Sequence, residues 1–174
     1  HASLGHLLGR GGAFSAAADA FGRALKLVRA QASDGRVDSE LVLGHATALI
    51  LSERYGEARA VLEQASSAFG DLAFKHALAR LLATCPDHSV RDGERATRLA
   101  EQVMNRQLTL QHAETMAMAL AEVGRFDEAL ALQNRVLDQA RRGGHDSGSE
   151  HSERLSRARA YQEHRPIRAP WSQE

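Results

Sequence analysis

The sequence is poor in cysteine, proline and aromatic residues. Among its 174 residues are a single cysteine, Cys85, three prolines and only 5% aromatic side chains. A lone cysteine excludes an internal disulfide and argues against a thiolate metal site. Scarce proline combined with abundant alanine, leucine, arginine and glutamate is typical of an all-helical protein.

An excess of charge of either sign is also lacking, because 22 lysines and arginines face 22 aspartates and glutamates. Nucleic-acid-binding proteins usually carry a basic excess, so we expect no nucleic-acid partner. No apolar run approaches the roughly 20 residues of a membrane helix, so we expect no direct membrane insertion. The chain begins at His1 without an initiator methionine or signal peptide, which suggests an excised fragment and leaves the compartment, cytoplasm or periplasm, open.

Signatures of catalysis and of metal binding are missing as well. The sequence contains no GxSxG motif, phosphate-binding loop or GxGxxG motif, and the glycine-rich residues 9–12 lack the strand and Lys-Ser/Thr that a phosphate loop needs. None of the nine histidines has another three or four positions away on one helix face, which is the spacing of a zinc site. We therefore expect no enzyme, no metal and no cofactor.

Cys85 has two interpretations. Its thiol could be activated by the nearby imidazole of His88, or it could be a small apolar side chain tucked under a turn. The second interpretation is favoured, because nothing else around Cys85 suggests a catalytic group.

What the sequence does contain is a recurring alternation of small and large apolar residues. It runs through residues 4–25 and returns in residues 116–137. Small residues at matching positions of successive segments recur at intervals of 33 to 41 positions, at Gly5, Ala46, Ala79 and Ala117. Short antiparallel helices need small residues wherever their backbones approach closely.

This pattern resembles the tetratricopeptide repeat (TPR) family, whose helix-turn-helix units of about 34 residues stack into a superhelix. The resemblance implies an all-α, right-handed superhelix of four helix-turn-helix repeats plus a C-terminal capping helix. The repeats would span about 1–31, 37–69, 71–107 and 109–142, followed by a flexible loop at 143–149 and a capping helix with an extended tail at 150–174. In each repeat the second helix would bury an alanine against the first, at Ala17, Ala58, Ala96 and Ala129.

Local signals refine this alignment. Glu53 stands where the second repeat is expected to have a turn glycine. The third repeat resembles a bacterial TPR variant with a lengthened turn, in which Pro86 ends the first helix and Asp92 caps the second.

The resemblance also implies a concave groove lined by the first helix of each repeat. Carried onto this sequence, the groove positions are His6, Arg10, Glu40, Leu43, Thr47, Ile50, Leu51, His76, Arg80, Thr84, Gln111, Glu114, Met118 and Glu122. Three of them, Leu43, Ile50 and Leu51, would form an apolar strip, unless Ile50 and Leu51 pack against the next helix instead. Arg10 and Arg80 would flank this strip as carboxylate-binding groups.

These observations predict a scaffold that binds a partner polypeptide or peptide segment through the groove, without catalysis of its own. One alternative is a self-associating regulatory or targeting module of a larger enzyme or secretion machine, which would form a homo-oligomer. Another is a small-ligand binder or an enzyme that uses the groove as its pocket. The lysine/asparagine clamp with which some TPR domains hold chaperone tails is absent, so that function is not expected.

Overall fold

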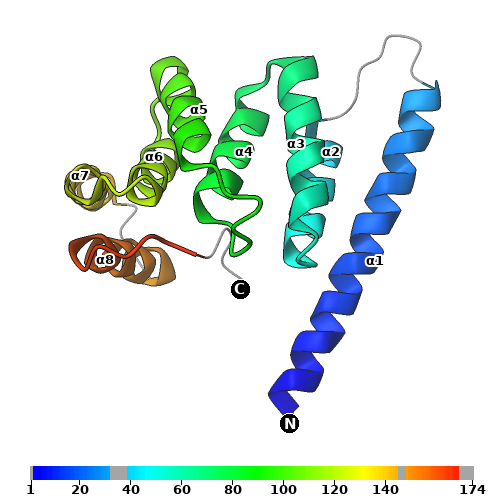
Figure 1. Ribbon diagram of the computed structural model, residues 1–174, viewed down its shortest axis with the longest axis horizontal. Coiled ribbons are helices and arrows are strands. Elements are labelled where there is room, and N and C mark those ends of the chain that lie inside the picture. The colour runs from blue at the N-terminus through cyan, green and yellow to red at the C-terminus, as the bar shows by residue number, and fades with distance from the viewer. Residues whose placement is uncertain (1, 32–38, 145–147, 169–174) are drawn as a thin grey trace. The chain divides into compact units, whose positions relative to one another are not determined.

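The computed structural model describes residues 2–31, 39–144 and 148–168, with side chains for 12–27, 39–144 and 148–168. Within these ranges the chain forms helices joined by turns, without a strand (Figure 1). The helices are α1 (Ala2–Gln31), α2 (Ser39–Leu51), α3 (Tyr55–Phe69), α4 (Leu72–Thr84), α5 (Gly93–Arg106), α6 (Leu110–Glu122), α7 (Phe126–Arg142) and α8 (Gly148–Gln162). The all-α prediction is confirmed. None of these described helices combines the length and the apolar character needed to cross a membrane.

The chain divides into two compact units, His1–Phe74 and Lys75–Glu174. In the first unit α1 packs on α2 and α2 packs on α3. In the second unit α5 packs on α6, α6 on α7 and α7 on α8. Helices that follow one another in sequence thus pack in adjacent pairs, an arrangement consistent with a helical repeat.

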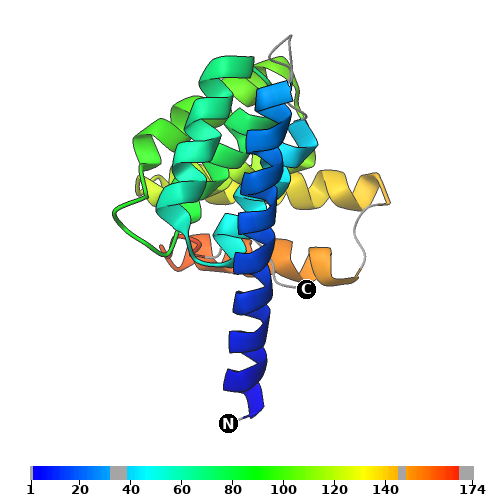
Figure 2. The same cartoon turned by 90° about the vertical axis from the view of Figure 1, so that its right-hand side faces the viewer.

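The predicted first hairpin is wrong, because α1 is a single helix of 30 residues (Figure 2). It runs without a break through residues 9–12, where the repeat alignment expects a turn. Glycine costs a helix about 1 kcal/mol relative to alanine but does not block it as proline does. The register also differs by one position, since Ala18 is fully buried whereas the predicted Ala17 is only half-buried.

Two glycines allow α1 and α2 to approach each other closely. A Cβ atom added to Gly44 would lie 3.2 Å from the ring of Phe21, and one added to Gly22 would lie 3.4 Å from Nε2 of His45. The missing side chains leave room for these two rings against the opposite backbone.

The turns that follow α2 and α6 have the same hydrogen bonds. After α2 the backbone N–H of Arg54 donates to the carbonyl of Leu49, and after α6 the N–H of Arg125 donates to that of Leu120. This is the Schellman ending of a helix, which needs a residue with positive φ. In the turn after α2 the residue with positive φ is Glu53, with φ 61°. It stands where the alignment expects a turn glycine.

The same ending also closes α8. His164 has φ 53°, and the N–H of Arg165 donates to the carbonyl of Ala160. The predicted capping helix therefore ends in the same way as the first helices of the two hairpins. It begins at Gly148, slightly earlier than predicted.

The two helix boundaries predicted for the lengthened turn of the third repeat, at Pro86 and at Asp92, are confirmed. Helix α4 ends at Thr84, two residues before Pro86. The Asp92 carboxylate accepts a hydrogen bond from the backbone N–H of Arg95 at 3.0 Å and so caps α5. Residues 145–147 of the predicted loop and 169–174 of the predicted tail lie outside the described residues.

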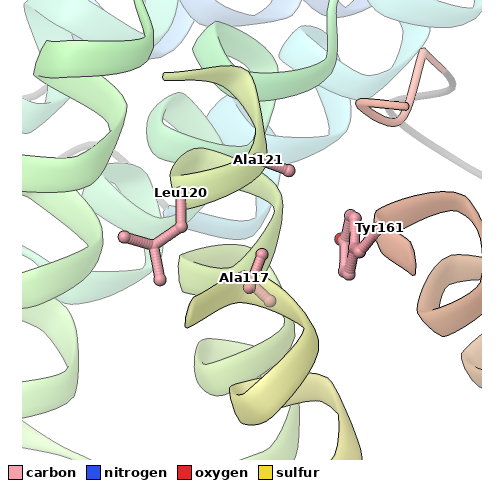
Figure 3. Close-up of a cluster of buried hydrophobic side chains, with 5 residues drawn as sticks. Ala117, Leu120, Ala121 and Tyr161 are labelled. Atoms are coloured by element: carbon pink, nitrogen blue, oxygen red, sulfur yellow. The ribbon is translucent and has the colours of Figure 1, made fainter. Parts of the chain in front are cut away.

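The last helix closes the core of the second unit through Tyr161. This side chain is fully buried and belongs to one apolar cluster with Ala117, Leu120 and Ala121 of α6. Figure 3 shows Ala121 pointing toward Tyr161 and Leu120 on the other side of α6. Ile167, beyond the end of α8, packs against the same cluster. Ala129 of α7 completes the cluster, fully buried as predicted.

We expect Ala129→Leu to destabilise the second unit, because a larger side chain would wedge α7 away from α6. Overpacking of this kind costs about 1–3 kcal/mol, which lowers a melting temperature by several degrees. Ala131→Leu is the matched control, since Ala131 is exposed on the same helix. Equal thermal unfolding curves for the two variants would contradict this packing.

Gly93 permits a second close approach, between the start of α5 and the end of α6. A Cβ atom at Gly93 would lie 2.8 Å from Cγ1 of Val123 and 2.9 Å from Cγ of Glu122. Because Val123 is β-branched and stiff, we expect Gly93→Ala to cost about 1–3 kcal/mol in chemical unfolding. Gly56→Ala is the control, because a Cβ atom there would have nothing within 4 Å, and we expect it to leave the free energy of unfolding unchanged or raise it. Equal free energies of unfolding for the two variants would contradict the close approach at Gly93.

Candidate functional site

The groove positions of the first unit lie on α1 and α2. His6 and Arg10 are on α1, with side chains outside the described residues. On α2, Glu40 is exposed and Leu43, Thr47 and Leu51 are half-buried. Only Ile50 of this group is buried.

Four predicted groove residues are buried, and three of them also line no cavity among the described residues, so their assignment to the groove is wrong. These three are Ile50, Thr84 and Met118. The Thr84 hydroxyl donates to the carbonyl of Arg80 at 2.8 Å, so it is satisfied within its own helix. Of the predicted apolar strip, only Leu43 and Leu51 remain partly exposed. Ile50 packs inside the protein, which is the alternative considered for it from the sequence.

Glu122 is enclosed by two arginines rather than presented to solvent as an acidic group. Arg91 Nε donates to Glu122 Oε1 at 3.0 Å, and Arg168 forms an ion pair with Oε2. Both arginines lie outside the helices from which the groove was predicted. The far end of the predicted groove is therefore neutralised at this position.

Three other predicted residues come together around a cavity in the second unit. Arg80 of α4 and Gln111 and Glu114 of α6 line a cavity of about 250 Å³. Helix α8 supplies the rest of its lining, with Ser149, Glu150, Glu153, Arg154 and Arg157. The cavity is thus built from three helices that are far apart in sequence.

Glu114 is the centre of an ion-pair network in this cavity. Arg154 Nε donates to Glu114 Oε1 at 2.8 Å, and Arg157 Nη1 donates to Oε2 at 3.1 Å. The same arginines pair along their own helix with Glu150 at 3.0 Å and Glu153 at 2.7 Å. A buried carboxylate needs such partners, because leaving it unpaired is strongly destabilising.

Arg154 and Arg157 were not among the predicted site residues. They lie on the last helix, beyond the repeat alignment, so the family pattern could not indicate them. The available signal was the pair of Glu-to-Arg spacings of four residues, 150 to 154 and 153 to 157, which places one charged face on α8.

Burial and charges of both signs act on Arg80. Burial lowers the pKa of its guanidinium, and the nearby charge of Arg157 lowers that pKa further. Glu114 and Glu153 act in the opposite direction with smaller effects. The arginine of α8 therefore outweighs either carboxylate at this position.

Next to Arg80, one turn earlier on α4, His76 contacts α6. Its Nε2 lies 2.8 Å from the hydroxyl of Thr115, and its ring meets that of His112 edge-on with centroids 4.7 Å apart. His112 Nδ1 donates to the carbonyl of Gln107 at 2.7 Å. Burial, the charge of His112 and that of Arg80 lower the pKa of His76 from 6.5 to about 4.

The region of Cys85 carries no activated thiol. Cys85 is fully buried, and this burial raises the pKa of its thiol. The side chain of His88 is 89% exposed. The interpretation of Cys85 as a small buried side chain under the turn is confirmed. Among the residues that the structure describes, no three metal-ligating side chains are grouped.

The shifted pKa of His76 predicts a loss of stability in acid. Unfolded His76 takes up a proton near pH 6.5 whereas the folded residue does so only near 4, so stability falls as the pH drops between these values. We expect a melting temperature several degrees lower at about pH 5 than at about pH 7.5, and a weaker pH dependence in His76→Gln. In His88→Gln the melting temperature should depend on pH as in wild type. If it depends on pH in the same way in both variants, His76 is not the group responsible for the loss of stability in acid.

Comparisons with known proteins identify no family, because no family model, no curated protein and no solved structure matches the chain. The site is therefore characterised by its own geometry. It is a polar cavity between α4, α6 and α8, lined by Arg80, Gln111 and the residues of the Glu114 network.

Proposed function

We propose that this chain is a TPR-like scaffold that binds a segment of a partner polypeptide at the cavity between α4, α6 and α8. The observation that carries the proposal is the convergence of Arg80, Gln111 and Glu114 on one cavity. These three residues were selected from the sequence only because the TPR resemblance assigns them to a partner-binding groove. In such arrays the first helix of each repeat forms the binding face, and α4 and α6 are the corresponding helices here.

The helical arrangement supports the TPR-like part of this proposal. Sequential helices pack in adjacent pairs, and the same Schellman ending follows α2, α6 and α8. Arg54 and Arg125, at equivalent places after two of these turns, each form an ion pair with a glutamate three residues later. A right-handed superhelix is the expected form of such an array.

The size and polarity of the cavity favour a peptide over a small organic ligand. Pockets for drug-sized ligands are mostly apolar and measure about 300–1,000 Å³. This cavity, of about 250 Å³, is lined by charged and polar side chains. Such a site fits one or two polar side chains of a longer segment.

Self-association is less well supported by the described surface. The large apolar side chains that are exposed there, Leu27, Phe69, Leu108 and Leu155, are dispersed over separate segments of the chain. Scattered exposed apolar residues are normal in monomeric proteins and do not indicate an interface.

The proposal is tested by affinity capture followed by direct binding measurements. A protein captured by the chain is purified and titrated calorimetrically against wild type and against the double variant Arg80→Gln/Gln111→Ala. We expect the double variant to bind at least about tenfold more weakly, because both side chains line the cavity.

Arg98→Gln serves as the control, because Arg98 is exposed on α5 and does not line the cavity. It should bind the partner like wild type. If the double variant keeps both its wild-type melting temperature and its wild-type affinity, the partner binds elsewhere and the proposal is wrong.

A further inference from the structure

We propose that the cavity between α4, α6 and α8 recognises an acidic segment, with a carboxylate of that segment held by Arg80 beside Arg154 and Arg157. This inference deepens the proposed function and rests on it for the statement that the acidic group belongs to a partner polypeptide. It concerns the chemical class of the ligand, which the proposed function leaves open.

The first argument is the balance of buried charge. Three guanidinium groups line the cavity, and the side chains of Arg154 and Arg157 are only 7% and 13% exposed. Of the three carboxylates, Glu114 is 11% exposed whereas Glu150 and Glu153 are 68% and 37% exposed. The lining thus holds as many glutamates as arginines, but solvent screens the two outer carboxylates, so guanidinium groups outnumber carboxylates in its buried part.

The environment of Arg80 agrees with this balance. The charge of Arg157 affects Arg80 more strongly than that of Glu114 or that of Glu153 taken singly. An incoming carboxylate would offset the repulsion between Arg80 and Arg157. A basic segment would instead add a positive charge beside these guanidinium groups.

The second argument is the geometry of the donors. A guanidinium presents five N–H donors in a planar fork, and Arg154 and Arg157 each hold Glu114 together with one glutamate of α8. A carboxylate of the ligand would take the place of these more exposed glutamates. Glu114 fixes the positions of Arg154 and Arg157 before any ligand arrives. Prepositioned side chains lose less conformational freedom on binding, which favours affinity. Gln111 is exposed at the same cavity and can add an amide donor.

The test is a selection from a library of random 12-residue peptides displayed on phage, with the wild-type chain as bait. We expect the selected peptides to be rich in aspartate and glutamate. A synthetic fluorescent copy of one selected peptide, and a copy with every acid replaced by its amide, are then compared by fluorescence anisotropy. The amide copy should bind at least about tenfold more weakly than the acidic peptide, and a higher salt concentration should weaken the binding of the acidic peptide.

Variants of the chain locate the binding. We expect two substitutions in the cavity lining to lower the affinity for the acidic peptide severalfold. Arg80→Gln removes a hydrogen-bond donor, and Gln111→Glu adds a negative charge. Because Gln111 is exposed, the second variant remains informative if the first fails to fold. Arg98→Gln and Gln139→Glu, both at exposed positions on other helices, should bind like wild type.

The outcomes separate the two proposals. Neutral or basic peptides, no selected peptides, or acidic peptides that bind equally to wild type, Arg80→Gln and Gln111→Glu would overturn the inference. If acidic peptides do not bind but the affinity of the natural partner still falls when Arg80 is replaced, the proposed scaffold function is supported and the inference about an acidic ligand is wrong. If acidic peptides bind as expected but the natural partner does not depend on Arg80, the inference about the cavity stands and the proposed function fails.

Discussion

The close approach of antiparallel helices at alanine is the constraint on which this structure depends. Ala58, Ala96 and Ala129 are fully buried on α3, α5 and α7, one on the second helix of each hairpin. A side chain that ends at Cβ lets two helix axes come together without a gap, and this distance then determines which neighbouring residues meet. Gly93 does the same at the junction of α5 and α6, where even a methyl group would be too large.

The second determinant is the burial of one carboxylate, Glu114. A carboxylate removed from water needs cationic partners, and Glu114 pairs with two arginines of α8, Arg154 and Arg157. The arginines that neutralise Glu114 therefore also line the cavity. The apolar anchor of α8, Tyr161, fixes the helix at its other end, so the two charged side chains are held in place by packing as well as by charge.

Features set by local chemistry could be predicted from the sequence, whereas features set by distant contacts could not. Pro86 and Asp92 act within their own turn, and the helix ends that they predict are present. The continuous α1 was missed because glycines in residues 9–12 permit both a turn and a helix, and the surrounding packing decides between them. The groove positions were predicted only in part. The alignment assigns a face to each helix, but it could not show that Ile50 and Met118 turn inward or that Arg154 and Arg157 reach Glu114 from outside the repeats.

The origin of one wall of the cavity in the last helix has a consequence for biosynthesis. As the chain is made, α4 and α6 are complete before α8 has been synthesised, and at that stage Arg80 is the one arginine of the cavity lining that exists. Docking of α8 brings in two buried guanidinium groups, while its own glutamates remain nearer to solvent. If the cavity binds acidic segments as proposed, a nascent or truncated chain without α8 has two of the three arginines of that site missing.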